Sequence, residues 1–222
     1  MCNRYGFQNP IHRLLQLLGE AGLPAGWAQG GTIPNLEPQP QIRPTNTAPV
    51  LRPAAAEAPG QGVDLALLRW GLVPFFHKGP LKSWKVLGTN ARSETVATTA
   101  SFRGAFKSRR CLVPATCFYE WTGLKGDKTM WRIAPTDGDI MVFAGLWDRA
   151  VTEDGVIESY TILTTTAGDD IADYHDRQPV VLDRPHLARW LDLSADVSDL
   201  LRAGPAGRLK VERFEPATSL FP

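Results

Sequence analysis

The architecture of this chain is most evident from the run Cys111-Leu112-Val113-Pro114-Ala115-Thr116-Cys117-Phe118-Tyr119-Glu120-Trp121. Apolar and aromatic residues dominate the run, which is typical of a buried β-strand. Alternation with a period of two places Phe118 and Glu120 on one face and Tyr119 and Trp121 on the other. We therefore expect a strand that carries a single carboxylate into an aromatic environment.

Further strand-like runs occur on both sides of this one. They span residues 65–73, 129–133, 140–147 and 160–165. Turn-forming residues at 123–127 and 135–139 separate some of them. This spacing predicts an α+β fold with a mainly antiparallel, barrel-like β core and short flanking helices.

The helices are expected at four places. Asn9 is a candidate N-cap, and Pro10 the first residue, of a leucine-rich helix. The other three follow Asn90 or span residues 185–193 and 197–203. Residues 24–62 are rich in Pro, Gly, Gln and Ala, which indicates a long irregular loop within a single domain of residues 1–222.

Composition excludes several classes of protein. The 222 residues are 43% hydrophobic and 21% charged, which is enough apolar material for a core and argues against global disorder. Lys plus Arg is 24 and Asp plus Glu is 23, so the net charge of +1 argues against a histone-like protein. It does not exclude nucleic acid, because binding depends on where the charge lies.

The three cysteines, at 2, 111 and 117, fit neither a disulfide framework nor zinc-finger spacing. No apolar run reaches membrane-spanning length, and the N-terminus lacks a signal-peptide pattern. We therefore expect a cytoplasmic protein without metal, cofactor or membrane contact. A monomer is the default, because no spare apolar helix indicates an interface.

The second residue is chemically special if Met1 is removed. Cys2 then carries an amine and a thiol on one residue, with ordinary pKa values of roughly 7.7–8 and roughly 8.5. The amine can condense with an aldehyde to an imine, and the thiol can close a thiazolidine ring onto it. The alternative is that Cys2 is an incidental small residue after the initiator.

Three other segments carry candidate chemical groups. Asn90 and Arg92 place an amide and a guanidinium two residues apart, Glu120 lies among aromatic residues, and His175 precedes an apolar strand. A carboxylate in apolar surroundings is either paired or has a raised pKa, which suits general acid–base chemistry. Each residue also has an ordinary structural role open to it: a helix cap, a surface ion pair, an edge charge or a structural histidine.

Seven motifs follow one another along the chain. They are Met-Cys-x-Arg-Tyr at 1–5, Asn-x-x-Pro at 46–49, Trp-Gly-Leu-Val-Pro at 70–74, Asn-Ala-Arg-Ser-Glu-Thr at 90–95, Cys-Leu-Val-Pro-Ala at 111–115, Phe-Tyr-Glu-Trp at 118–121 and His-Asp-Arg-Gln-Pro-Val-Val-Leu at 175–182. In this order they resemble the SRAP family, the SOS-response-associated peptidases. The sequence departs from the usual family pattern at Asn3 and Gln178.

The resemblance implies a sensor of abasic sites in single-stranded DNA that forms a covalent DNA–protein crosslink. Cys2 would supply the amine and the thiol, Asn90 would position the amine, Glu120 would act as acid and base, and His175 would relay protons. An autopeptidase activity that removes Met1 and an AP-lyase activity are also implied.

The resemblance also implies residues that contact DNA. Arg4 and Arg92 would hold phosphates, Thr164 would line the site, and Asn46 and Trp70 lie in matching motifs. Apart from the resemblance, Phe75 and Phe76 are candidates to stack on bases, with core packing as the alternative.

Two other functions remain open. A cysteine hydrolase would use Cys2 as nucleophile and His175 as base on an amide substrate. A DNA-binding module would bind without covalent chemistry. Metal binding is the least favoured function.

The small net charge conceals an uneven distribution. Residues 69–110 contain nine basic residues and one acidic residue, a net charge of +8. Residues 137–202 contain five basic and 14 acidic residues, a net charge of −9. If the fold keeps the basic segment on one face, that face attracts a phosphate backbone in a salt-dependent way.

Overall fold

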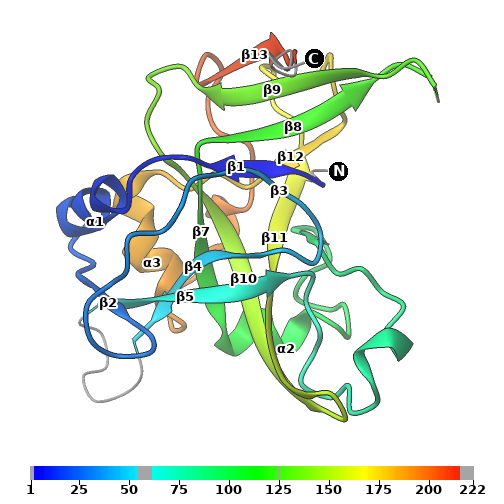
Figure 1. Cartoon of the computed structure of the whole chain (residues 1–222). Coiled ribbons are helices and arrows are strands. Elements are labelled where there is room, and N and C mark those ends of the chain that lie inside the picture. Colours follow the sequence, from blue (N-terminus) through cyan, green and yellow to red (C-terminus); the bar gives the residue numbers. More distant parts are fainter. Residues whose placement is uncertain (1–2, 55–61, 125, 216–222) are drawn as a thin grey trace, which may run out of the picture.

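A computed structural model describes residues 3–54, 62–124 and 126–215 (Figure 1). Its strands form two sheets. The smaller sheet contains β1 (Tyr5–Phe7), β3 (Gln39–Ile42), β8 (Cys117–Thr122), β9 (Thr129–Pro135) and β13 (Leu209–Arg213). The larger contains β2 (Ala25–Trp27), β4 (Thr47–Pro53), β5 (Val63–Trp70), β6 (Asn90–Arg92), β7 (Arg110–Ala115), β10 (Met141–Thr152), β11 (Gly155–Thr166) and β12 (Arg177–Pro179).

Five strands of the larger sheet close into a barrel. Neighbouring strands pair in the order β11, β10, β7, β4 and β5, and these pairings are antiparallel. The ring closes where β5 pairs with β11 in parallel, with Tyr160 opposite Trp70. The expected α+β fold with a mainly antiparallel, barrel-like core is therefore confirmed.

The run 111–121 passes from one sheet to the other. It forms β7 in the barrel and β8 in the smaller sheet, and the two strands separate at Thr116, whose backbone N–H donates to Gly6 O at 2.7 Å. The expected alternation holds in β8: Phe118 packs in the main core, while Tyr119 packs in a separate small cluster with Trp121. This strand therefore separates two apolar regions and carries Glu120 beside the main core.

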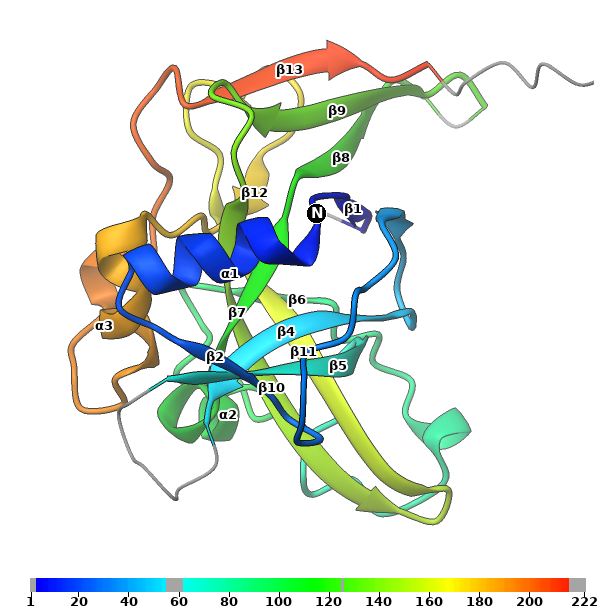
Figure 2. The same ribbon diagram turned by 60° about the vertical axis from the view of Figure 1, so that its left-hand side comes forward.

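Helices are short and lie at the edge of the strands. They are α1 (Ile11–Glu20), α2 (Arg103–Ser108) and α3 (Leu187–Leu191), with 3-10 turns η1 (Leu81–Ser83), η2 (Arg184–His186) and η3 (Ser198–Leu200). Figure 2 shows α1 and α3 on the same side of the barrel. Within the described residues, no helix combines the length and the apolar character needed to cross a lipid bilayer.

Two expectations about local structure are wrong. Residues 24–62 are not one irregular loop, because β2, β3 and β4 lie within them; β2 pairs with β5, β3 with β1, and β4 with both β5 and the more distant β7. Asn90 does not precede a helix; it begins β6, which pairs in parallel with β11. In both cases pairing with remote strands, which local composition does not report, determines the structure.

The helix ends also differ from expectation. Helix α1 begins at Ile11 with Pro10 in the N-cap position, and Asn9 lies outside it. The expected helix at 185–193 divides into η2 and α3, and the one at 197–203 is only the turn η3. Short amphipathic segments therefore form where expected, with fewer helical turns.

Gly145 in β10 provides a test of the barrel packing. A Cβ atom there would lie 2.9 Å from Cys111 Sγ and 2.9 Å from Val113 Cγ2. Because overpacking a core costs about 1–3 kcal/mol, we expect Gly145→Ala to lower the free energy of unfolding by that amount in denaturant titrations. The control is Gly204→Ala, since a Cβ at Gly204 has no neighbour within 4 Å. Equal stability of the two variants would contradict the packing described here.

Candidate active site

The carboxyl group of Glu120 is buried and has a shifted pKa. Strand β8 places it beside the core with a relative exposure of only 2%. Burial, which disfavours the ionised form, is the main cause that raises the pKa of Glu120 to about 7, and the negative charge of Asp176 acts in the same direction. Near neutral pH this group therefore exists in both protonation states, as a group that both donates and accepts protons must.

His175 lies next to Glu120, on the segment that leads into β12. Its Nε2 is 3.7 Å from Glu120 Oε2. Its Nδ1 lies 2.9 Å from the backbone nitrogen of Arg177 and 2.8 Å from Asp176 Oδ1. In the neutral ring with a proton on Nε2, Nδ1 accepts the Arg177 N–H, and in the protonated ring Nδ1 donates to Asp176.

Both shifts at this pair favour uncharged groups. Burial lowers the pKa of His175 while it raises that of Glu120. At 3.7 Å the two side chains are too far apart for a direct hydrogen bond. A polar substrate atom that lies beside both groups can take a proton from one and give one to the other.

Asn90 approaches the N-terminal segment through Thr89. Asn90 Nδ2 donates to Thr89 Oγ1 at 3.3 Å, and Thr89 Oγ1 donates to Asn3 Oδ1 at 3.4 Å. Asn3, which replaces the usual family glycine, is exposed and contacts this pair. Asn90 is therefore connected to the residue that directly follows Cys2. Cys2 itself lies outside the described residues.

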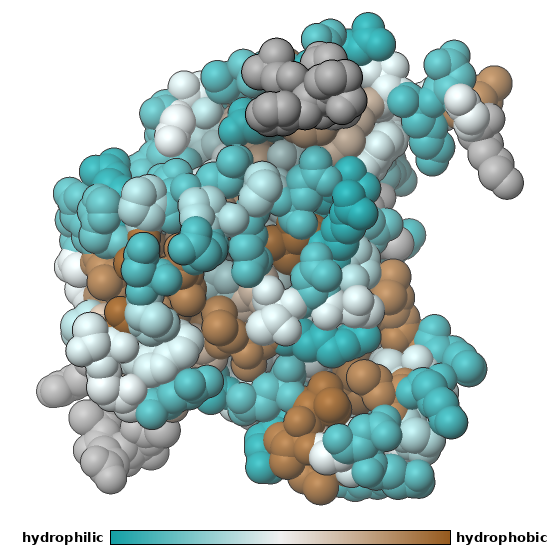
Figure 3. Space-filling model, in the orientation of Figure 1, coloured by the Kyte–Doolittle hydropathy of each residue, from teal (hydrophilic) through white to brown (hydrophobic). Residues whose placement is uncertain are grey.

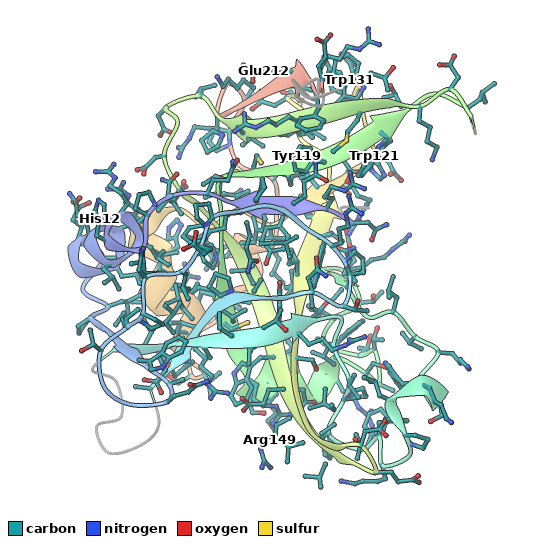
Figure 4. The ribbon with its side chains drawn as sticks, viewed as in Figure 1. His12, Tyr119, Trp121, Trp131, Arg149 and Glu212 are labelled. Atoms are coloured by element: carbon teal, nitrogen blue, oxygen red, sulfur yellow. The ribbon has the colours of Figure 1, made fainter. Side chains whose placement is uncertain are left out.

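Strand β1 holds the same segment from the other side. Tyr5 pairs with Phe118 of β8, and the backbone N–H of Tyr119 donates to Arg4 O at 2.9 Å. Figure 4 shows Tyr119 and Trp121 along β8. The backbone at Arg4 is therefore fixed one residue from Glu120 along β8.

Thr164 and Arg177 connect the three neighbouring strands β6, β11 and β12. In register, Thr164 of β11 lies opposite Arg92 of β6 and Pro179 of β12. Arg177 donates to Thr164 O at 2.7 Å and forms a bidentate ion pair with Glu94, at 2.6 and 2.9 Å. This pair fastens the segment after Asn90 to the segment after His175.

The sequence does not predict the Arg177–Glu94 pair; from the sequence, Glu94 and Asp176 are both possible surface partners of Arg92. One signal was present: Arg177 is a charged residue at the start of an apolar run, and such residues are buried only when paired. Its side chain is indeed only 9% exposed.

The two arginines expected to hold phosphates have different surroundings. Arg92 is exposed, and its guanidinium forms no ion pair within the part of the chain that the structure describes. Arg4 is partly buried, donates to Gln41 Oε1 at 3.3 Å and lies over the Trp121 ring at 5.0 Å. Arg92 is thus open to an anion, and Arg4 is held in a defined orientation.

Two residues expected to contact DNA instead use their side chains to support the local structure. Trp70 is fully buried, so direct contact with DNA is not open to it; its indole N–H donates to Thr89 O at 2.9 Å and supports the residue before Asn90. Asn46 is exposed, but its Oδ1 accepts the backbone N–H of Arg43 at 2.9 Å and closes a turn. Gln178 uses its side-chain oxygen to accept the Gly168 N–H.

Phe75 and Phe76 lie on the surface, so the alternative of core packing is wrong. Their relative exposures are 53% and 45%, and their rings contact each other edge to face at 5.6 Å. Figure 3 shows apolar side chains gathered on the lower-right lobe, where the segment between β5 and β6 lies. That segment belongs to the basic region 69–110, so exposed aromatic rings and positive charge occur on one lobe.

Comparison with known proteins identifies relatives over most of the chain. A model of the family "SOS response associated peptidase (SRAP)" matches residues 1–217. The abasic site processing protein YoaM of Bacillus subtilis is 34% identical over 169 residues, 75% of this chain and 74% of that protein. The abasic site processing protein HMCES of Xenopus tropicalis is 30% identical over 191 residues, 75% of this chain and 57% of that protein.

Solved structures share the fold. A protein from Bacteroides thetaiotaomicron superposes with a TM-score of 0.79 at 22% identity, covering 96% of this chain and 92% of that one. A protein from Bordetella bronchiseptica superposes with a TM-score of 0.74 at 27% identity, covering 97% of this chain and all of that one.

The raised pKa of Glu120 predicts a cost in stability at high pH. The folded state holds the Glu120 proton up to about pH 7, whereas the unfolded chain loses it near 4.5, so stability falls as pH rises between these values. We expect Glu120→Gln to gain up to about 3 kcal/mol relative to the wild type between pH 4 and pH 8. Denaturant titrations at both pH values measure this gain.

The matched control is Glu37→Gln, which replaces an exposed carboxylate. Its stability relative to the wild type should be the same at both pH values. If the free energy of unfolding of Glu120→Gln relative to the wild type is also the same at both pH values, the raised pKa assigned to Glu120 is wrong.

Proposed function

Because the chain belongs to the SRAP family, we propose that it processes abasic sites in single-stranded DNA by covalent capture. Capture uses Cys2 as the N-terminal residue after Met1 is removed. The product is a thiazolidine that links the protein to C1′ of the abasic sugar. The names of the relatives, abasic site processing proteins, support the same class of substrate.

The reaction requires protons to move at each step. Opening of the sugar removes the proton from its C1′ hydroxyl, adds one to the ring oxygen and exposes an aldehyde. The Cys2 amine then adds to the aldehyde carbon, and water leaves to give an imine. Finally the thiol sulfur bonds to the imine carbon while its proton passes to nitrogen, so the crosslink forms without an oxidant or reductant.

The observation that carries this proposal is the Glu120–His175 pair. Its carboxyl group has a pKa of about 7, its imidazole is held neutral by burial, and the two lie 3.7 Å apart. Glu120 protonates the ring oxygen and the departing water, and His175 relays protons to and from the sugar hydroxyl. Asn90, connected to Asn3 through Thr89, positions the amine.

Residues that do not contact the abasic sugar's reacting atoms bind the rest of the DNA strand. Arg4 and Arg92 bind phosphates beside the lesion, with Thr164 lining the site. Phe75 and Phe76 stack on neighbouring bases, as exposed aromatic rings do in proteins that bind single strands without sequence preference. The protein acts as a monomeric single domain in the cytoplasm, on the nucleoid.

Two further activities belong to the same proposal. Autocatalytic removal of Met1 exposes Cys2. An imine at C1′ acidifies the adjacent C2′ proton, so proton abstraction at that carbon expels the 3′ phosphate in a lyase reaction.

Covalent capture is tested with an oligonucleotide that contains one abasic site. We expect a shifted band on a denaturing gel that survives heating with detergent, and intact mass should show the loss of Met1. Cys2→Ala and Cys2→Ser should form no heat-stable crosslink. Both variants keep the N-terminal amine, so each should form an imine that borohydride traps. The proposal fails if the wild type, with Cys2 at its N-terminus, forms no crosslink.

The role of Glu120 predicts a particular pH dependence. The crosslinking rate of the wild type should change around pH 7 as Glu120 titrates. Glu120→Gln should lower the rate by about 100-fold or more, within the range for loss of a general acid–base, and should remove this transition. The control Glu212→Gln, on the outer strand β13, should leave rate and profile unchanged. An unaltered profile in Glu120→Gln would contradict the assigned role.

The cysteine hydrolase alternative gives a different result in the same assays. It requires His175 to activate the thiol for attack on an amide, and it does not require a carboxyl group that titrates near neutral pH. Turnover of a peptide amide without DNA crosslinking would favour it.

A further inference from the structure

Two arginines lie opposite each other across strands β1 and β3, an arrangement that disfavours folding. In the antiparallel pairing of β1 with β3, Tyr5 lies opposite Ile42. Arg4 precedes Tyr5 and Arg43 follows Ile42, so the next position of this register sets the two arginines opposite each other. Like charges directly across a pair of strands are destabilising, and a protein retains them at a cost.

The two guanidinium groups are also brought to one acceptor. Arg4 Nη1 lies 3.3 Å from Gln41 Oε1, and Arg43 Nη2 lies 3.2 Å from the same oxygen. A carbonyl oxygen has two lone pairs, so these two donors saturate it. Burial lowers the pKa of Arg4, and the positive charge of Arg43 lowers it further. In the described part of the chain, no carboxylate forms an ion pair with Arg43, and its side chain is exposed.

The turn that carries Arg43 is strained and fixed. Residues 43–46 form a turn with Pro44 at its second position and Thr45 at its third, where Thr45 has a φ of 74°. A β-branched residue in this left-handed region costs about 1–2 kcal/mol. Asn46 N–H donates to Arg43 O at 3.0 Å, and Asn46 Oδ1 accepts the Arg43 N–H at 2.9 Å.

A third bond ties this turn to the barrel, because the Thr45 N–H donates to the last residue of β5, Trp70, at 2.8 Å. Arg4 is fixed as well, since its guanidinium lies over the Trp121 ring at 5.0 Å. The backbone at Arg43 and the guanidinium of Arg4 are therefore held in place, and Gln41 brings the two guanidinium groups to one oxygen.

We propose that Arg43 and Arg4 together bind one phosphodiester group of the DNA strand close to the captured sugar, with Asn46 fixing the turn that presents Arg43. This rests on the proposed function, because the ligand is the backbone of the same DNA. An anion between the guanidinium groups removes their repulsion, and Arg43, which is exposed, has five N–H donors of which Gln41 takes one. Arg4 is two residues from Cys2, a span of at most about 7 Å.

The proposal gives Asn46 a role different from direct DNA contact. Its side chain is committed to the turn, so its effect on binding passes through the position of Arg43. Asn46 is thus a positioning residue, and Arg43 is the residue that contacts the ligand.

The test measures non-covalent binding with a tetrahydrofuran analogue of the abasic site, which has no aldehyde and cannot crosslink. Fluorescence anisotropy over a range of salt concentrations gives the slope of log Kd against log salt. Each phosphate contact on a single strand contributes about 0.7 to this slope. We expect Arg43→Gln to reduce the slope by up to about 0.7, since Arg4 still contacts the same phosphate. Arg43→Lys should restore the slope, and Arg13→Gln, an exposed arginine on α1, should leave it unchanged.

A second arm locates the phosphate and distinguishes the DNA backbone from a free anion. Oligonucleotides carry one uncharged methylphosphonate linkage at successive positions. In the wild type, one position beside the lesion should weaken binding several-fold, and the same position should have a clearly smaller effect in Arg43→Gln, in which only Arg4 contacts that phosphate. If every position affects wild type and variant equally, Arg43 does not bind a backbone phosphate.

The outcomes separate the subsite from the function. If the wild type crosslinks the abasic site and binds the analogue, but Arg43→Gln retains the full salt slope, the subsite is wrong and the proposed function stands. If the wild type neither binds nor crosslinks, both are wrong. A reduced slope in Arg43→Gln with intact crosslinking chemistry supports the subsite.

Discussion

The site depends on the burial of one carboxyl group. Strand β8 carries Glu120 to the edge of the main core, where water cannot solvate its charge, and burial raises its pKa to about 7. The same desolvation lowers the pKa of His175 and keeps the imidazole neutral. A carboxyl group that titrates near neutral pH, with a neutral imidazole 3.7 Å away, can move protons in either direction, and the proposed capture of an aldehyde requires such transfers. The cost is a carboxyl group that destabilises the protein whenever it ionises.

The rest of the architecture keeps that pair beside the N-terminus. The barrel closes through β5 and β11, which places β6 and β12 along β11 and therefore brings Asn90 and His175 to one end of the same strand. The Arg177–Glu94 pair then fastens these two segments together. Strand β1 pairs with β8 and carries the chain past Glu120 toward Cys2. Each catalytic group thus comes from a different segment, and long-range strand pairing determines their positions.

The sequence predicts the identity of the candidate catalytic residues better than it predicts the strand pairing and contacts around them. Glu120 and His175 are recognisable from an aromatic run and from motif order, and alternation in β8 correctly assigns Phe118 and Tyr119 to opposite faces. The strands within 24–62 are missed, because β3 pairs with β1 and not with a local neighbour. The opposition of Arg4 and Arg43 depends on that pairing, so no local pattern reports it. Trp70 and Asn46 lie in motifs associated with the site, yet burial and a turn commit both side chains to support.

The carboxyl group of Glu120 should titrate with a pKa near 7 in the folded protein. A carbon-detected NMR titration of protein labelled with ¹³C at the glutamate carboxyl groups measures this pKa, with Glu120→Gln used to assign the signal. We expect a Glu120 midpoint at about 7. A Glu120 signal that titrates near the usual 4.5 and does not change around neutral pH would contradict it.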